Sequence, residues 1–216
     1  MLWKTFGGGI VIVFPVLLVG LPLSWIIQNS FLVNHPIAHG FAKAFLTAAI
    51  PEEFFKFLVL ALFCARSVEF DEPMDGIVYG AIASLGFATF ENIIYVLDGG
   101  LSLAIARGFT AVPGHASFGV IMGYFYGRAY FSRTESSKTA LFLLAYGLPT
   151  LLHGLYDAFL FCPANIAATY GPGIDMSDMD SLITMLSFAG FFLTLGFTFH
   201  RAYRYIKVMQ KEQERM

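Results

Sequence analysis

Two neighbouring carboxylates and a lysine lie inside one of the most apolar parts of the chain. Glu52, Glu53 and Lys56 stand between the segments IAHGFAKAFLTAAIP and FLVLALFC. On membrane-insertion scales a charged residue at the centre of a helix costs about 2.5 to 3.5 kcal/mol, so these side chains need partners within the protein or a wet cavity. Glu52 and Lys56 are four residues apart and share a helix face, which neutralises one glutamate locally while Glu53 points elsewhere.

Three further apolar segments carry polar or ionisable side chains. FATFEN contains Glu91 and Asn92, a Pro-Gly pair precedes His115, and HGLYD contains His153 and Asp157. The spacing of four places His153 and Asp157 one above the other on the same helix face. Carboxylates and imidazoles therefore occur on four separate apolar segments.

Such a set of side chains permits the hydrolysis of an amide. Carboxylates and imidazoles can hold a water, remove its proton and stabilise the oxyanion that forms. The set can also ligate a divalent metal such as zinc, for which Glu91, His115 and His153 offer two imidazoles, one carboxylate and an open position for water. The sequence leaves open whether the attacking water is bound to a metal.

Composition identifies the environment in which this chemistry must take place. Of the 216 residues, 57% are hydrophobic and only 13% are charged, whereas soluble domains average about 45 to 50% apolar and 25% charged residues. The net charge is −2 and the basic residues are scattered, which excludes nucleic acid as a partner. The chain is expected to reside in a lipid bilayer.

Transmembrane helices must then position the polar residues. With about 20 apolar residues needed for each span, the sequence predicts six spans, at 6–28, 37–65, 74–97, 111–131, 139–161 and 181–203. We expect an all-α, polytopic bundle that forms a single domain over 1–216, with its motif-bearing core at 37–161. At about 1.5 Å per residue, the polar groups of the different spans fall at a common depth, in the outer half of the bilayer.

The basic residues predict the orientation of these spans in the cell membrane. If both termini are cytoplasmic, ten of the thirteen lysines and arginines lie on the cytoplasmic side, where such residues concentrate. Arg107 is then the single basic residue of the outer loops. Lys43 and Lys56 lie within a span, and Lys43 is interpreted as a residue whose long side chain reaches toward the interface.

Proline and glycine predict several irregularities. Pro51 should disturb the second span just before the two glutamates. The segment 111–115, AVPGH, should break the helix, so that the residues from Leu101 onward form a seventh, short or re-entrant helix. The segment 171–173, Gly-Pro-Gly, predicts an outer loop. Repeated glycines along 76–86 and 119–127 indicate close packing between two helices.

Taken in order, four motifs resemble one known family. They are E-E-x-x-K at 52–56, F-x-x-x-E-N at 87–92, P-G-H at 113–115 and H-x-x-x-D at 153–157, and together they resemble the PrsW family of intramembrane proteases. The related prenyl proteases of the CAAX type carry E-E-x-x-x-R and F-x-x-x-H, from which Lys56 and Glu91 depart. The resemblance covers 51–157 and implies a membrane-embedded endopeptidase, whose best-known relative cuts an anti-sigma factor near the extracytoplasmic face.

The leading hypothesis is an intramembrane endopeptidase that acts on a single-pass membrane protein. Glu52 or Glu53 would be the general base that activates water, while Glu91, His115 and His153 would hold the water, the oxyanion or a metal. The supporting roles belong to neighbours of these residues: Asp157 would orient His153, Lys56 would neutralise the second glutamate, and Asn92 would assist Glu91.

Two alternatives stay open from the sequence. Buried Glu, His, Asp and Lys side chains also form the proton relays of ion-coupled transporters. The same groups can serve only as polar contacts between the helices of a non-catalytic scaffold.

Overall fold

The computed structural model describes residues 1–170 and 174–214, and these are almost wholly helical. The elements are α1 (Leu2–Val11), α2 (Val13–Gln28), η1 (Phe31–Asn34), α3 (Pro36–Ala42), η2 (Lys43–Ala49), α4 (Ile50–Val59), η3 (Leu60–Cys64), α5 (Pro73–Phe109), α6 (Ala111–Tyr130), α7 (Glu135–Ala168) and α8 (Asp178–Gln213). No strand occurs among the described residues. The predicted all-α fold is therefore confirmed, and the loop predicted at 171–173 lies outside the described residues.

Four helical stretches are long and apolar enough to cross a membrane. They are Leu2–Gln28, Pro73–Leu97, Glu135–Ala168 and Asp178–Gln213. The other two predicted spans coincide with the run from α3 to η3 and with α6, which is helical for 20 residues. The multi-pass character is thus supported, while the count of six spans stays a prediction.

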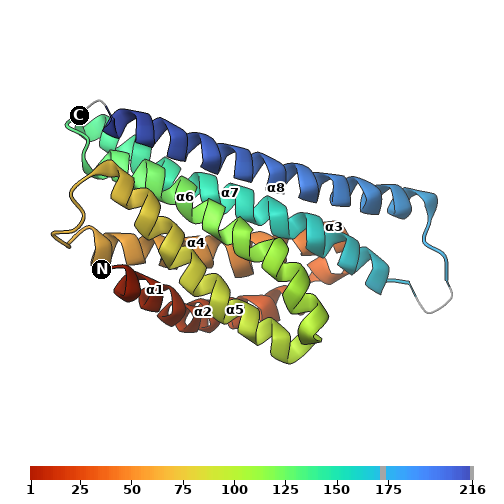
Figure 1. Cartoon of the computed structure of the whole chain (residues 1–216). Helices are drawn as coiled ribbons and strands as arrows, with labels where there is room; N and C mark the ends of the chain where they lie inside the picture. The colour runs from red at the N-terminus through yellow and green to blue at the C-terminus, as the bar shows by residue number, and fades with distance from the viewer. Residues whose placement is uncertain (171–173, 215–216) are drawn as a thin grey trace.

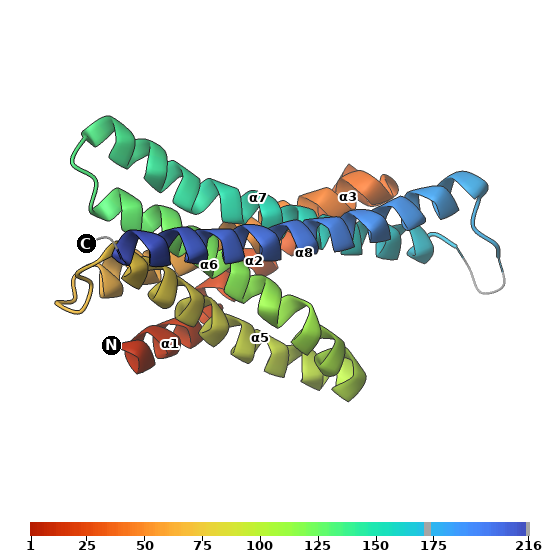
Figure 2. The same ribbon diagram turned by 45° about the horizontal axis from the view of Figure 1, so that its top comes forward.

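The helices form one elongated bundle (Figure 1). α8 packs along α6 and α7, while α1 and α2 pack against η2, α4 and α5; Figure 2 shows α8 running across the other helices from a second direction. The N-terminus, the connection between η3 and α5 and the C-terminal end of α8 lie at one end of the bundle (Figure 1). The end of α7, the start of α8 and the turn between α5 and α6 lie toward the opposite end.

Glycines bring α5 and α6 into backbone contact. A Cβ atom at Gly123 would lie 1.9 Å from the carbonyl oxygen of Gly76, and a Cβ atom at Gly80 would lie 2.3 Å from the carbonyl oxygen of Gly119. Any side chain at these positions would separate the two helices. The close packing predicted from the glycine pattern is confirmed, and it places Glu91 of α5 near His115 of α6.

The stretch that carries the two glutamates changes its helical type twice. η2 and η3 are π-helical, and the α-helix α4 lies between them. Pro51 occupies the first turn of α4, directly after η2, at the position of the predicted disturbance. A proline has no N–H to give to the preceding turn, and single π-helical turns in α-helices are frequent at functional sites.

The predicted break before α6 occurs one residue earlier than the segment 111–115. The chain turns at Thr110, and α6 begins at Ala111. Pro113 is not the cause, because it lies in the first turn of α6, where helical N–H groups have no partner and proline is tolerated. A second interruption, which the sequence reasoning missed, lies at Gly100, whose φ of 73° is in the left-handed region that favours glycine. The short helix predicted from Leu101 onward is the helical segment between these two points, which ends at Phe109.

Candidate functional site

Glu53 is at the centre of a buried network of charged groups. Its side chain is fully enclosed, and its Oε1 atom accepts hydrogen bonds from Nζ of Lys56 at 2.7 Å and from Nδ1 of His153 at 2.9 Å. Lys56 lies one turn further along α4, whereas His153 comes from α7. Glu53 therefore ties these two helices together.

Lys56 connects this centre to α6. Its Nζ atom lies 3.0 Å from Nδ1 of His115 and 3.6 Å from Oε2 of Glu52, and it stands 4.5 Å from the centre of the Phe87 ring. An ammonium group can only donate hydrogen bonds, so Nδ1 of His115 must be the acceptor. His115 is therefore the neutral tautomer with its proton on Nε2, and this nitrogen donates to Oε2 of Glu91 at 3.0 Å.

His153 lies between two carboxylates. Opposite its bond to Glu53, its Nε2 atom is 3.3 Å from Oδ2 of Asp157 and 3.9 Å from Oε2 of Glu52. The ring stacks on Phe118 with centroids 5.1 Å apart and meets the ring of His115 edge-on at 4.9 Å. These contacts fix the orientation of the imidazole, and both nitrogens can donate when it is protonated.

Glu91 has a cationic partner that the sequence reasoning missed. Nη2 of Arg107 donates to Oε2 of Glu91 at 2.7 Å, and Nε of the same arginine donates to Oδ1 of Asn92 at 3.3 Å. The guanidinium also lies over the ring of Tyr95, 3.6 Å from its centroid. One signal pointed to this role: Arg107 is the single basic residue of the predicted outer loops, and it follows the Gly-Gly pair at which α5 bends.

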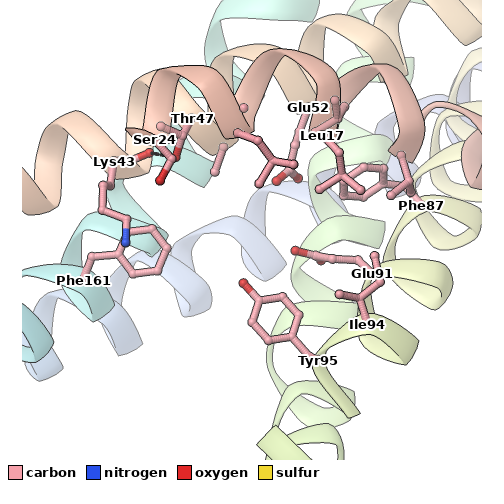
Figure 3. Close-up of a pocket in the computed structure, with 15 residues that line it drawn as sticks. Leu17, Ser24, Lys43, Thr47, Glu52, Phe87, Glu91, Ile94, Tyr95 and Phe161 are labelled. Carbon is pink, nitrogen blue, oxygen red and sulfur yellow. Dashed lines mark hydrogen bonds between the residues drawn. The ribbon is translucent and has the colours of Figure 1, made fainter. Parts of the chain in front are cut away.

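Of the two neighbouring glutamates, only Glu52 faces open space. It lines a cavity of about 390 Å³ together with Glu91, His115, His153 and Asp157. It also lines a groove of about 520 Å³ on the side of α2, and Figure 3 shows Glu52, Glu91 and Tyr95 directed into this space. Its Oε2 atom is buried and has no hydrogen-bond partner among the described residues, which leaves it able to bind a water or an ion.

The residues fit a divalent metal. Glu52, His115 and His153 can each present one ligand atom, all within 4.8 Å of one another. Both nitrogens of His115 are engaged in the structure, so metal binding requires His115 to release either Lys56 or Glu91. Two imidazoles, one carboxylate and a free position match a common catalytic zinc set, and the unpartnered oxygen of Glu52 faces this point. The group assembled by the structure contains Glu52 where the sequence pattern suggested Glu91, and Glu91 is paired with Arg107.

The structure joins all of the site residues inferred from the sequence. Glu52, Glu53 and Lys56 lie on α4, Glu91 and Asn92 on α5, His115 on α6, and His153 and Asp157 on α7. Each of them contacts another member of the set or Arg107. Four helices thus form one site that combines a water-accepting carboxylate, fixed imidazoles and compensated charge, as hydrolysis requires.

Comparison with known proteins agrees with this chemistry. A model of the PrsW family of intramembrane metalloproteases matches residues 1–195. The chain is 44% identical over 158 residues to a protease PrsW of Geobacillus kaustophilus, an alignment that covers 73% of this chain and 65% of that protein. It is 37% identical over 166 residues to a protease PrsW of Bacillus subtilis, covering 76% and 72% of the two chains. No solved structure matches the chain.

Proposed function

This chain belongs to the PrsW family of intramembrane metalloproteases, and on that basis we propose that it hydrolyses a peptide bond of a membrane protein at the cavity beside Glu52. The family predicted from the four motifs is confirmed. Membership of this family also confirms the predicted class of enzyme, a membrane peptidase. The observation that carries the proposal is the position of Glu52, which lines the cavity together with His115 and His153. One oxygen of Glu53 also lacks a partner, but Glu53 does not line this cavity.

Glu52 is the proposed acceptor of the proton of water. Glu53 is unsuited to this role because Lys56 and His153 enclose it. Glu91 is neutralised by Arg107, and Asp157 faces His153. A base must lie within hydrogen-bond reach of the water that it activates. Glu52 and Glu53 each have an oxygen without a hydrogen-bond partner, but only Glu52 of the two lines the cavity.

The remaining residues of the network would guide the reaction. As the oxygen of water bonds to the substrate carbonyl carbon, its proton passes to Glu52 and negative charge develops on the carbonyl oxygen. His153, held by Glu53 and Asp157, can donate a hydrogen bond to this oxyanion. When the carbon–nitrogen bond breaks, the leaving nitrogen takes up a proton from the cavity groups. Lys56 and Arg107 form ion pairs with Glu53 and Glu91 and hold these carboxylates in place.

A divalent metal would be held by Glu52, His115 and His153 after His115 releases Lys56 or Glu91. Glu52 and His153 would then act as ligands in place of the roles of proton acceptor and oxyanion donor. When bound, it would polarise the substrate carbonyl and make a bound water more acidic. The neighbouring contacts are those expected around metal-ligating histidines, since Glu53 and Asp157 flank His153 and Glu91 bonds to His115.

The proposal includes a location and a class of substrate. We infer six spans in the cell membrane with both termini cytoplasmic, and a cut near the extracytoplasmic face of a single-pass protein such as an anti-sigma factor. Two observations support this orientation. The N-terminus and the C-terminal end of α8 lie at the same end of the bundle (Figure 1). Basic residues also occur near that end, and Lys and Arg are more frequent in cytoplasmic segments.

A cleavage assay in membranes tests the proposal. The full chain is co-expressed with tagged single-pass reporter proteins, and the fragments are followed by immunoblotting. We expect wild-type cleavage to disappear in Glu52→Gln, while the variant inserts into membranes normally. Unchanged cleavage by Glu52→Gln, Glu91→Gln and His153→Gln would remove the assignment of the site.

A further inference from the structure

A groove leads away from the charged network toward α2. It has a volume of about 520 Å³ and is lined by α2, η2 and α5, with a contribution from Phe161 of α7. Its apolar lining consists largely of Val13, Val16, Leu17, Leu21, Phe87 and Ile94. Ala48, Glu52, Glu91, Tyr95 and Phe161 line both this groove and the smaller cavity. The groove therefore meets the proposed reaction centre at Glu52.

Lys43 lies at the far end of this groove from Glu52 (Figure 3). Its Nζ atom is 5.7 Å from the centre of the Phe161 ring. Among the side chains that the structure describes, the ion pairs of lysine involve Lys56 and Lys138, and none involves Lys43. The sequence predicted that Lys43 reaches toward the membrane interface. In the structure Lys43 lines the groove, where its positive charge complements an incoming anion.

Polar groups between Lys43 and Glu52 suit an unwound peptide. In a membrane, free backbone N–H and C=O groups are tolerated only where protein or water supplies hydrogen-bond partners. Ser24 and Thr47 bring hydroxyl groups to the groove, and Tyr95 brings a phenol. Gly20 packs so closely on η2 that a Cβ atom there would lie 2.9 Å from the carbonyl oxygen of Thr47.

The spacing of the two charged residues gives a ruler. Lys43 and Glu52 are nine residues apart on a continuous helical path. This corresponds to at most roughly 13 Å at the α-helical rise of about 1.5 Å per residue, because the π-helical η2 rises less per residue. An extended peptide covers this distance with about four residues, at about 3.4 Å each.

We propose that the groove receives an extended, mainly apolar segment of the substrate, and that Lys43 selects an acidic side chain about four residues from the bond that is cut. This inference rests on the proposed function, because Glu52 marks the position of the scissile bond. It adds a determinant of sequence preference to the reaction centre.

A set of synthetic peptides tests the ruler. Each is an apolar transmembrane peptide with a single glutamate, moved one position at a time, and the full-length protein is reconstituted in liposomes. Mass spectrometry identifies the bond that is cut. We expect the cut to follow the glutamate at a separation of about three to five residues. The rate should exceed that of the glutamate-free peptide by about tenfold, as a charge-assisted contact allows.

Variants of Lys43 separate recognition from catalysis. Lys43→Met should lose the tenfold preference and keep the slow rate on the glutamate-free peptide, whereas Lys43→Arg should retain the preference. Lys43→Glu should instead prefer a peptide with one lysine at the same place. Lys138→Met, a lysine on the surface of α7, is the matched control and should behave as wild type.

Binding is measured separately by disulfide cross-linking. Ser24→Cys places a thiol in the groove, and each peptide carries a cysteine beside its glutamate. The native Cys64 and Cys162 are buried, and Leu193→Cys on the exposed surface of α8 provides the control. Cross-linking at position 24 should be lost when Lys43 is replaced. Cross-linking at the control position 193 should be the same with and without Lys43.

The outcomes distinguish this inference from the proposed function. Cleavage whose rate and position ignore both the glutamate and Lys43 would overturn the inference and leave the peptidase intact. Cross-linking that depends on Lys43 without any cleavage would support recognition and contradict the proposed function. Absence of both would overturn both.

Discussion

The enclosed cluster of Glu53, Lys56, His115 and His153 differs sharply from the groove between Lys43 and Glu52. Both regions draw a lysine and a glutamate from the same helical stretch, η2 to α4. In the enclosed cluster each charge has close partners, and Glu53 and Lys56 are wholly inaccessible. In the groove, Lys43 and Glu52 line open space, and Glu52 is 3.6 Å from Lys56, beyond hydrogen-bond distance. Closely paired charges hold the helices in place, whereas charges that line a cavity are available to a substrate.

The largest expected effect separates the two glutamates. Glu52→Gln should lower the cleavage rate by about 10²- to 10⁴-fold, the usual contribution of a general base, with little change in thermal unfolding. Glu53→Gln should lower both the rate and the stability, because its oxygen accepts bonds from two helices. Rates are measured with purified protein in liposomes, and unfolding by circular dichroism in detergent. Equal stability of the two variants would contradict the division into an enclosed and an open region.

The two lysines provide the second comparison. Lys56→Met should destabilise the protein by about 3 to 5 kcal/mol, since it leaves the buried Glu53 without its cation. Lys43→Met removes a charge with no ion-pair partner among the described residues, so its unfolding should stay within about 0.5 kcal/mol of wild type. Chemical denaturation of both variants in the same detergent measures the difference. Similar losses in both would show that the groove lysine is also structural.

Metal binding tests which carboxylate belongs to the metal set. If Glu52, His115 and His153 hold the metal, Glu52→Gln should lower the bound zinc more strongly than Glu91→Gln. Glu91→Gln changes a hydrogen-bond partner of His115 and not a proposed ligand. Loss of such a partner typically lowers metal affinity by about 10- to 100-fold. Metal analysis of the purified variants gives the stoichiometry. A chelator should abolish wild-type cleavage, and added zinc should restore it; cleavage that resists complete metal removal would speak against the metal set.

The smallest expected effect concerns Arg107. Arg107→Met removes the donor to Glu91 and Asn92 and should lower the cleavage rate by about tenfold, as loss of a charge-assisted hydrogen bond would. Arg107→Lys should recover part of this loss, because it restores the charge but not the two-pronged geometry. Arg201→Met, on α8 and outside the site, is the matched control. A rate unchanged in Arg107→Met would restrict Arg107 to a structural role.

The sequence predicted the site better than the path of the chain. Glu52, Glu53, Lys56, Glu91, His115 and His153 were recognisable because a charged side chain in an apolar helix needs a partner. The break before α6 was predicted to within one residue, but its attribution to Pro113 was wrong, since proline is tolerated in the first turn of a helix. The interruption at Gly100 was missed. Arg107 was assigned to a loop. The Gly-Gly pair before it was the one signal of a bend, but the sequence does not show that this bend brings Arg107 back to Glu91.

Composition and residue spacing by themselves determined that this chain is a helical membrane protein with acids and imidazoles placed on four apolar segments. Only the tertiary structure decided which glutamate is enclosed and which faces the cavity. The spacing of four residues assigned Lys56 to Glu52 and left Glu53 to point elsewhere, and this was wrong: Lys56 donates to Glu53 at 2.7 Å and lies 3.6 Å from Glu52. Adjacent residues of an α-helix point about 100° apart, and the packing of His153 from α7 encloses Glu53 while Glu52 faces the cavity. The same holds for Lys43 and Lys56, whose roles depend on the neighbours that packing supplies.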